Sequence, residues 1–311
     1  MKAVRIHQYG KATELKYEDA PMPALGATDV LVKTVATSVN PVDWKIREGY
    51  LKTMINYTMP LILGLDVSGV VEAVGKDVSR FKVGDAVYSR PATNRNGTYA
   101  EFVAINEKEI SRKPNTISHV EAASLPLAGI TAWEGLITHA KLSAGQKVLI
   151  HGGSGGVGTL AIQLAKSKGA FVITTTSSKN EALVKALGAD EVIDYKSQAF
   201  ETLVKNIDVV FDTIGGKTQE LSWQVLKEGG ILVSTVGQPS EALATKFKAR
   251  GVFFFIGPNA EILDNLAKLV EAEKIRPVIG AEFALADIAK AHALSESGRA
   301  IGKIALYVGQ P

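Results

Sequence analysis

The first third of the chain alternates short apolar runs with turn residues, a pattern typical of β-strands. Strands are expected at Val30–Thr34, Val67–Val74, Ala86–Tyr88 and Tyr99–Val103, where β-branched and aromatic residues are concentrated. Glycine and proline residues separate these runs and supply the turns between strands. The pattern therefore predicts an all-β unit over residues 1–113.

The pattern changes near Pro114. A stretch rich in alanine and leucine begins at Ser118, a suitable N-cap, and predicts helical structure through Ile137. After it, strands and helices alternate, which is typical of βαβ units around a parallel sheet. The strands are expected at Lys147–His151, Phe171–Thr175, Glu191–Ile193 and Val209–Asp212, and the helices at Val157–Lys168, Asn180–Leu187 and Phe200–Lys205.

Later segments complete this organisation. Segments 218–226, 231–236 and 252–256 would complete a parallel sheet of six strands. The tail predicts helices at Ala260–Glu273 and Asp287–Leu294, an extended segment at Ile275–Phe283 and a final strand at Ile304–Val308. We expect one domain over residues 1–113 and a second over 114–258, with residues 259–311 completing the two.

A glycine-rich turn follows the first strand of the second domain. The pattern Gly153-x-Gly155-x-x-Gly158 stands between a predicted strand and a predicted helix, as a dinucleotide-binding fingerprint requires. The first glycine permits a tight turn, the second lets the diphosphate approach the backbone, and the third lets helix and strand pack closely. Free N–H groups in the first helical turn, around Gly156 and Val157, favour negative charge. The turn therefore predicts a bound dinucleotide.

The residue types at the end of the strand Phe171–Thr175 predict whether NAD or NADP is bound. Sites that prefer NAD place a carboxylate there, on the ribose hydroxyls. This chain has only hydroxyl side chains and a lysine over Thr175–Lys179, and these groups suit a 2′-phosphate, so we expect NADPH. The same segment also fits a solvated loop in which Ser178 or Asn180 caps the next helix, and both interpretations are compatible.

Composition narrows the chemistry. With 311 residues, 46% of them hydrophobic and 22% charged, the chain can bury a sizeable core. It contains no cysteine, which excludes disulfides, thiolate metal sites and cysteine nucleophiles. The basic residues behind the net charge of +3 are scattered, so we expect no nucleic-acid partner. Because no signal peptide or long apolar segment is visible, we expect a cytoplasmic protein that does not enter a membrane.

The chain as a whole resembles the medium-chain dehydrogenase/reductase superfamily. This resemblance implies an α/β fold: a Rossmann doubly wound parallel sheet with a GroES-like β-rich catalytic domain. The zinc branch carries Gly-His-Glu-x-x-Gly, whereas residues 64–69 here read Gly-Leu-Asp-Val-Ser-Gly, so Leu65 stands at the position of the metal-binding histidine. The segment that supplies the branch's zinc cysteine is Ser38–Lys45 here, and the five histidines show no ligand-like pairing. We therefore expect no metal.

Within the superfamily, the chain most closely resembles the zinc-independent quinone oxidoreductase branch, especially its enone oxidoreductases and chloroplast-envelope quinone oxidoreductase-like members. The matching segments are residues 40–45, 121–128, 152–158, 193–195 and 297–303. The resemblance implies which residues bind NADPH. Those around the 2′-phosphate would be Ser177, Ser178, Lys179 and Tyr195, with Thr176 before them; those near the nicotinamide half would be Lys45 and Thr131, covered by Val236, Phe254, Phe255, Arg299 and Ala300.

The absence of a metal favours a conjugated acceptor. A quinone or enone delocalises the arriving negative charge, so the protein mainly has to align the nicotinamide with the electrophilic carbon. Lys45 is a candidate hydrogen-bond donor to the oxyanion or to the nicotinamide ribose, and Tyr50 or Tyr57 is a candidate proton source. Asn40 either orients the ring or caps a turn.

Other functions stay open at this point. The chain is alternatively an NADPH-binding sensor, or a structural or RNA-binding relative without turnover, and a zinc alcohol dehydrogenase is a third alternative that metal analysis would distinguish. The sequence does not choose between a quinone and an enone as the small-molecule substrate, or between one- and two-electron reduction. It also leaves open whether two copies pair as a homodimer through an exposed sheet edge.

Overall fold

The chain forms two compact units in a computed structural model that describes residues 1–309. Unit 1 comprises Met1–Leu127, Gly257–Ala272 and the tail from Pro277 onward, and unit 2 comprises Ala128–Ile256 and Glu273–Arg276. This division into units differs from the domain boundaries expected after residues 113 and 258, and those boundaries stay predictions.

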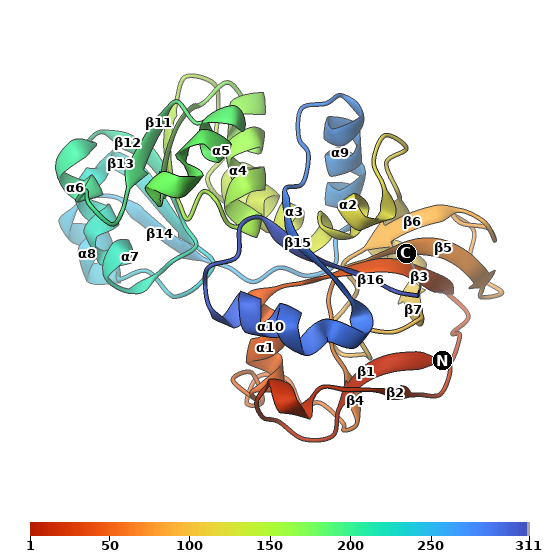
Figure 1. Cartoon of the computed structure of the whole chain (residues 1–311). Helices are drawn as coiled ribbons and strands as arrows, with labels where there is room; N and C mark the ends of the chain where they lie inside the picture. Colours follow the sequence, from red (N-terminus) through yellow and green to blue (C-terminus); the bar gives the residue numbers. More distant parts are fainter. Residues whose placement is uncertain (310–311) are drawn as a thin grey trace. The chain divides into compact units, whose positions relative to one another are not determined.

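Unit 1 is built mainly from β-strands (Figure 1). Its strands are β1 (Lys2–Ile6), β2 (Lys16–Asp19), β3 (Asp29–Val39), β4 (Leu61–Ile62), β5 (Val67–Val74), β6 (Ala86–Ser89), β7 (Phe102–Asn106), β8 (Ile110–Arg112), β15 (Ile279–Ala284) and β16 (Lys303–Tyr307). Within residues 1–309 these form a three-stranded sheet, β2-β1-β4, and a seven-stranded sheet, β15-β16-β3-β5-β6-β8, in which β7 also pairs with β3. All the pairs are antiparallel except β15 with β16.

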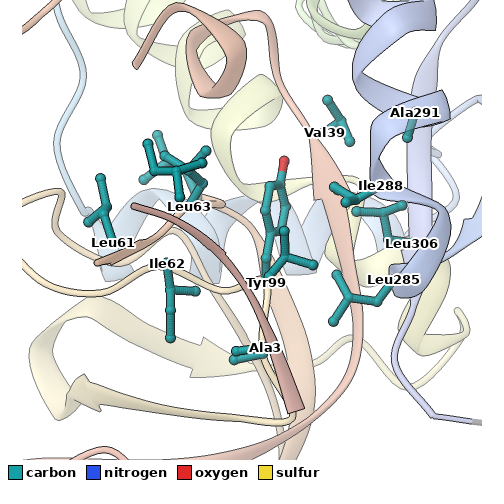
Figure 2. Packing of buried hydrophobic residues seen from close by; sticks show 14 of the residues in the cluster. Ala3, Val39, Leu61, Ile62, Leu63, Tyr99, Leu285, Ile288, Ala291 and Leu306 are labelled. Atoms are coloured by element: carbon teal, nitrogen blue, oxygen red, sulfur yellow. The ribbon is translucent and has the colours of Figure 1, made fainter. Parts of the chain in front are cut away.

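Short helices complete unit 1. They are η1 (Ala12–Glu14), α1 (Pro41–Arg47), η2 (Glu107–Glu109), α2 (His119–Ala123), α9 (Ala260–Glu271), η6 (Leu285–Asp287) and α10 (Ile288–Glu296). Figure 1 shows α10, from the end of the chain, lying beside α1. In the core that they share with the small sheet, the buried Tyr99 ring stands between Leu61 and Leu63 on one side and Ile288 and Leu306 on the other (Figure 2). This core fixes α1 against the tail.

Unit 2 is a parallel sheet with helical connections. Its strands are β9 (Lys147–His151), β10 (Phe171–Thr176), β11 (Glu191–Asp194), β12 (Ile207–Asp212), β13 (Leu226–Ser234) and β14 (Arg250–Phe253). Within the described residues their order is β11-β10-β9-β12-β13-β14 and every pair is parallel. Counted from β9, this is the order 3-2-1-4-5-6 of a doubly wound dinucleotide-binding sheet, which confirms the predicted fold class.

The helices of unit 2 lie before the first strand of its sheet and in the connections between the strands. They are α3 (Pro126–Trp133), the π-helix η3 (Glu134–His139), α4 (Gly156–Ser167), η4 (Ser178–Asn180), α5 (Glu181–Ala186), α6 (Phe200–Leu203), α7 (Gly216–Ser222), η5 (Trp223–Val225) and α8 (Glu241–Lys246). The parallel strands point their carboxyl ends to one edge, and the turn after β9 and the segment after β10 both lie there. None of the described helices combines the length and apolar character needed to cross a bilayer.

Two predicted elements are wrong in detail. The strand expected at Tyr99–Val103 begins only at Phe102, because the backbone of Tyr99 pairs elsewhere: its oxygen accepts from Val4 N at 2.8 Å and its N–H donates to Leu63 O at 3.0 Å. The continuous helix expected from Ser118 to Ile137 is divided into α2, α3 and η3. Pro126 begins α3 and lacks the N–H that would continue α2.

Candidate functional site

The turn after β9, residues 152–158, is a tight loop that only glycine fits at several positions. Gly152 has a φ of +73°. A Cβ at Gly158 would lie 2.2 Å from Gly152 O, and a Cβ at Gly153 would lie 2.0 Å from Thr174 Oγ1. A Cβ at Gly155 would meet only Gly152 O, at an ordinary 3.4 Å. The outer two glycines of the fingerprint are therefore needed for internal packing, while Gly155 leaves open space.

The backbone of this turn offers hydrogen-bond donors to an anion. Helix α4 begins at Gly156 and has twelve residues. The N–H groups of its first turn, at Gly156, Val157 and Gly158, have no carbonyl four residues earlier within the helix. The helix dipole adds positive potential at the same end. A diphosphate fits this arrangement of donors and space.

Hydroxyl and amide groups at the end of β10 and just after it connect to the same turn. Ser154 Oγ accepts hydrogen bonds from Thr176 Oγ1 at 2.9 Å and from Asn180 Nδ2 at 3.0 Å. Thr176 and Ser177 are buried, whereas Ser178 and Lys179 are exposed. We call residues 176–180 the hydroxyl loop. Its contact with Ser154 holds it beside the glycine turn.

One acid lies next to the hydroxyl loop. Asp194, at the end of β11, is the register partner of Thr176. Backbone hydrogen bonding, first from Lys196 N, holds the pKa of this exposed carboxyl below its usual value, and Ser178 also donates to it. Tyr195 follows with 61% of its surface exposed. An NAD-preferring site has a carboxylate at the end of the second strand. In this chain that position is Thr176, and the nearby carboxylate, Asp194, lies on the neighbouring strand β11.

The remaining nucleotide candidates of unit 2 differ in exposure. Val236 and Phe255 are exposed, at 42% and 66%, and are available for a ligand. Phe254 is buried and its ring lies 4.8 Å from that of His139, centroid to centroid. Thr131, in α3, is also buried.

Three of the four catalytic candidates of unit 1 lie on α1 or in the segment after it. Lys45 Nζ lies 5.7 Å from the centroid of the Trp44 ring, and Tyr50 meets the same indole edge to face at 6.1 Å. Tyr50 is 65% exposed. Tyr57 is half-buried, and this burial raises the pKa of its hydroxyl, which keeps it protonated at neutral pH. Tyr57 therefore retains a proton that could be transferred.

Asn40 belongs to a buried polar cluster, formed by Ser38, Asn40, Asp43, Asp66, Tyr99 and Lys303. Asn40 Oδ1 accepts from Lys303 Nζ at 2.5 Å and its Nδ2 donates to Asp66 Oδ2 at 2.8 Å. The residue is 2% exposed and precedes α1 as its N-cap. The amide of Asn40 thus already has two partners inside unit 1. A direct contact between Asn40 and the nicotinamide ring stays a prediction.

Asp43, in the first turn of α1, is the acid that this helix contributes to the cluster. Its Oδ2 accepts from Asn40 N and from the Tyr99 hydroxyl, each at 2.7 Å, while Oδ1 has no protein partner among the described residues. Burial raises the pKa of Asp43 to about 7, although these two hydrogen bonds lower it. The side chain therefore holds a proton over much of the acidic range.

The last candidates, Arg299 and Ala300, lie between α10 and β16. Arg299 is exposed and its N–H donates to Ser297 Oγ at 3.2 Å, while Ala300 packs against the core of unit 1. Asp66 and Lys303 lie in segments that resemble the family, but no role for either was predicted from the sequence. Ser154 was not predicted either, because its link to the hydroxyl loop has no signature in the fingerprint.

The histidines have local partners and do not gather around a metal position. His7 contacts Glu18 and His119 contacts Ser68, while His151 lies between Thr175 and Ser222. His292 is paired with Arg47. Among residues 1–309, no group of three or more histidine, aspartate or glutamate side chains could hold a metal ion.

Known protein families and relatives match this chain over most of its length. Residues 26–115 match the alcohol dehydrogenase GroES-like domain family, and residues 187–306 match the zinc-binding dehydrogenase family. A 2-methylene-furan-3-one reductase from Solanum lycopersicum is 39% identical over 99% of this chain and 79% of its own length. An NADPH-dependent alkenal/one oxidoreductase, chloroplastic, from Arabidopsis thaliana is 37% identical with the same coverage. The solved structure of the quinone oxidoreductase from Coxiella burnetii has a TM-score of 0.93 and 37% identity over 99% of each chain.

Proposed function

Because this chain belongs to the medium-chain dehydrogenase/reductase superfamily, in its quinone oxidoreductase branch, we propose that it reduces quinones or α,β-unsaturated carbonyls with NADPH. The observation that carries the proposal is the glycine turn with the hydroxyl loop beside it. The turn leaves backbone donors and space for a diphosphate, and the loop supplies the hydroxyls and the lysine that suit a 2′-phosphate.

NADPH fits the residues of unit 2. The N–H groups at Gly156, Val157 and Gly158 would hold the diphosphate, and Lys179 would neutralise the 2′-phosphate with help from Ser177. When bound, NADPH supplies the hydride. The exposed Tyr195 would stack on or hydrogen-bond the adenosine end, and Val236 and Phe255 would exclude water from the nicotinamide end. Phe254, Thr131, Arg299 and Ala300 keep the supporting roles that the family resemblance implies.

Zinc, in contrast, does not fit the residues of unit 1, although the name of one matching family implies it. Leu65, at the position of the metal-binding histidine, is buried in the apolar core. Asn40 and Asp66, in the two segments aligned with zinc ligands, hydrogen-bond each other. We propose that the reaction proceeds without zinc.

The side chains of unit 1 have proton and hydrogen-bond roles in this proposal. Lys45 donates a hydrogen bond to the oxyanion that develops on the acceptor or to the nicotinamide ribose, since an ammonium favours developing negative charge. Tyr57 or Tyr50 supplies the proton that completes reduction, since a tyrosine hydroxyl can act as a general acid. Asn40 acts through Asp43 and α1 as a positioning residue.

The test is loss of nicotinamide absorbance at a fixed protein concentration. The acceptor panel contains a benzoquinone, a short enone and the corresponding saturated ketone, each with NADPH and with NADH. We expect turnover with the quinone or the enone, little with the ketone and a preference for NADPH. Absence of turnover with every acceptor, together with tight NADPH binding, would instead favour a binding-only protein.

Assembly and location are separate proposals. Strand β14 is one of the two edge strands of the six-stranded sheet, and we propose that two copies pair there. The mass in solution, measured by light scattering, tests this. We also propose a cytoplasmic location, although several relatives are named as mitochondrial or chloroplastic. Fractionation of cells that contain the native chain would decide it.

A further inference from the structure

Lys303 lies where three strand ends meet at one edge of the large sheet of unit 1. Strand β16 begins at Lys303, β3 ends at Val39, and β5 begins one residue after Asp66. Ile304 pairs with Val39, and Thr37 pairs with Val67. Antiparallel pairing places the start of each strand beside the end of its neighbour. Lys303 and Asp66, 237 positions apart, thereby become adjacent.

Every N–H bond of the Lys303 ammonium has an acceptor. Its Nζ lies 2.5 Å from Asn40 Oδ1, 3.0 Å from Asp66 Oδ2 and 3.3 Å from Val39 O. A lysine ammonium has three donors and no acceptor. Since the residue is only 4% exposed, this ammonium has no N–H left for a substrate. It is therefore neither a proton donor nor an oxyanion ligand.

Both carboxylate oxygens of Asp66 accept hydrogen bonds, one of them from this ammonium. Its side chain is fully buried. Oδ2 accepts from Ser38 Oγ at 2.7 Å, as well as from Asn40 and Lys303, and Oδ1 accepts from Leu127 N at 2.7 Å. A buried carboxylate is strongly unfavourable unless it has both donors and a counter-charge. Lys303 supplies the counter-charge.

We propose that the ammonium of Lys303 is the resident cation of the polar cluster and stands where the zinc branch holds its metal ion. Asn40 and Asp66 belong to the two segments that align with the zinc ligands, and both direct an oxygen at Nζ. A divalent ion at this place would meet a positive charge at contact distance and oxygens that are already in use. The inference rests on the proposed function only in so far as that function uses no metal.

The first experiment is a double-mutant cycle on thermal unfolding, with Lys303→Met, Asp66→Asn and the double variant. We expect Lys303→Met to lower the melting temperature by about 10 °C, because Asp66 is left as an unpaired buried charge. Asp66→Asn should lower it in the unaltered background, since an amide N–H would face the ammonium, and raise it in the Lys303→Met background. Equal decreases in both backgrounds would overturn the proposal. Lys290→Met, which removes the exposed partner of Asp287, is the control and should change little.

The second experiment uses the unaltered chain, so it does not depend on the variants folding. In nitrogen-15 NMR of lysine side chains at neutral pH, we expect a slowly exchanging ammonium signal, because Lys303 is protected by three acceptors. Metal analysis of the same sample should find substoichiometric zinc, and a chelator should leave the melting temperature unchanged. A stoichiometric zinc ion whose removal lowers the melting temperature, or the absence of a slowly exchanging ammonium, would overturn the proposal. Neither readout involves turnover, so this outcome is separate from failure of the proposed function.

Discussion

The polar cluster of unit 1 and the glycine turn of unit 2 use polar groups in opposite ways. In the cluster, Lys303 and Asp66 are buried and their donors and acceptors are directed at each other or at neighbours. In the turn, the first N–H groups of α4 have no partner within the helix, and Gly155 keeps the space beside them open.

This difference separates structural from ligand-binding polar groups. A buried charge with a complete set of partners has nothing left to offer a ligand, and it makes the local fold depend on its counter-charge. A helix N-terminus with space beside it offers donors whose partner must come from outside. Changes in the cluster should therefore alter stability first, and changes in the open part of the turn should alter nucleotide affinity first.

The largest effect is expected from Gly158→Ala, which tests whether the closed part of the turn behaves like the cluster. The new Cβ would lie 2.2 Å from Gly152 O, a backbone atom that cannot move away cheaply. We expect a loss of about 3 kcal/mol of unfolding free energy and of NADPH binding. Chemical denaturation and a fluorescence titration with NADPH measure the two. Gly237→Ala, which meets nothing within 4 Å, is the control.

The next effect is the pH dependence of stability caused by Asp43. Its pKa is about 7 in the fold against an ordinary 3.8. Between these values the folded state keeps a proton that the unfolded state releases, so the free energy of unfolding falls as pH rises through this window and then levels off. We therefore expect Asp43→Asn to become more stable, relative to the unaltered chain, by several degrees in melting temperature between pH 4 and pH 7. If the melting temperatures of the variant and of the unaltered chain changed in parallel with pH, the raised pKa of Asp43 would be contradicted.

Gly155→Ala sharpens the comparison within the turn itself. Its Cβ has only an ordinary contact with the protein but occupies the space assigned to the diphosphate. We expect an unchanged melting temperature and NADPH affinity reduced about tenfold, or about 1.4 kcal/mol. Isothermal titration calorimetry measures the affinity. Unchanged binding would mean that the dinucleotide lies elsewhere.

Lys179→Ala tests the hydroxyl loop. Removing the ammonium should weaken NADPH about fivefold and leave NADH nearly unaffected, because only NADPH carries the 2′-phosphate. Competition titrations with both nucleotides give the ratio. Lys205→Ala is a charge-matched control, since Lys205 precedes β12 and so lies toward the amino ends of the strands. If both variants weakened NADPH equally, the effect would be net charge alone.

The smallest expected effect comes from Asp194→Asn. The variant removes the acid beside Ser178 without changing its size, and so reduces repulsion of the 2′-phosphate. We expect NADPH to bind about twofold more tightly, with NADH unchanged, because the exposed carboxylate is screened by solvent. Weaker NADPH binding would show instead that Asp194 mainly orders the hydroxyl loop.

The features that the sequence predicted are local patterns, and the features that it did not predict are contacts between distant segments. The order of strands and helices in unit 2 and the fingerprint at Gly153–Gly158 are local patterns, and the structure confirms the fold that they predict. The partnership of Lys303 with Asp66 could not be predicted, because it arises from strand pairing across 237 positions. The break of the helix at Pro126 was visible in the sequence, whereas the pairing that displaces Tyr99 from β7 required tertiary structure.

The most direct test of the proposed function follows the transferred hydrogen. With NADPH deuterated at the transferable position of the nicotinamide and a short enone, after treatment of the protein with a chelator, we predict deuterium at the β-carbon of a saturated ketone product. That result would establish conjugate reduction without a metal. Deuterium at the carbonyl carbon of an alcohol, or activity that disappears with the chelator and returns with zinc, would contradict it.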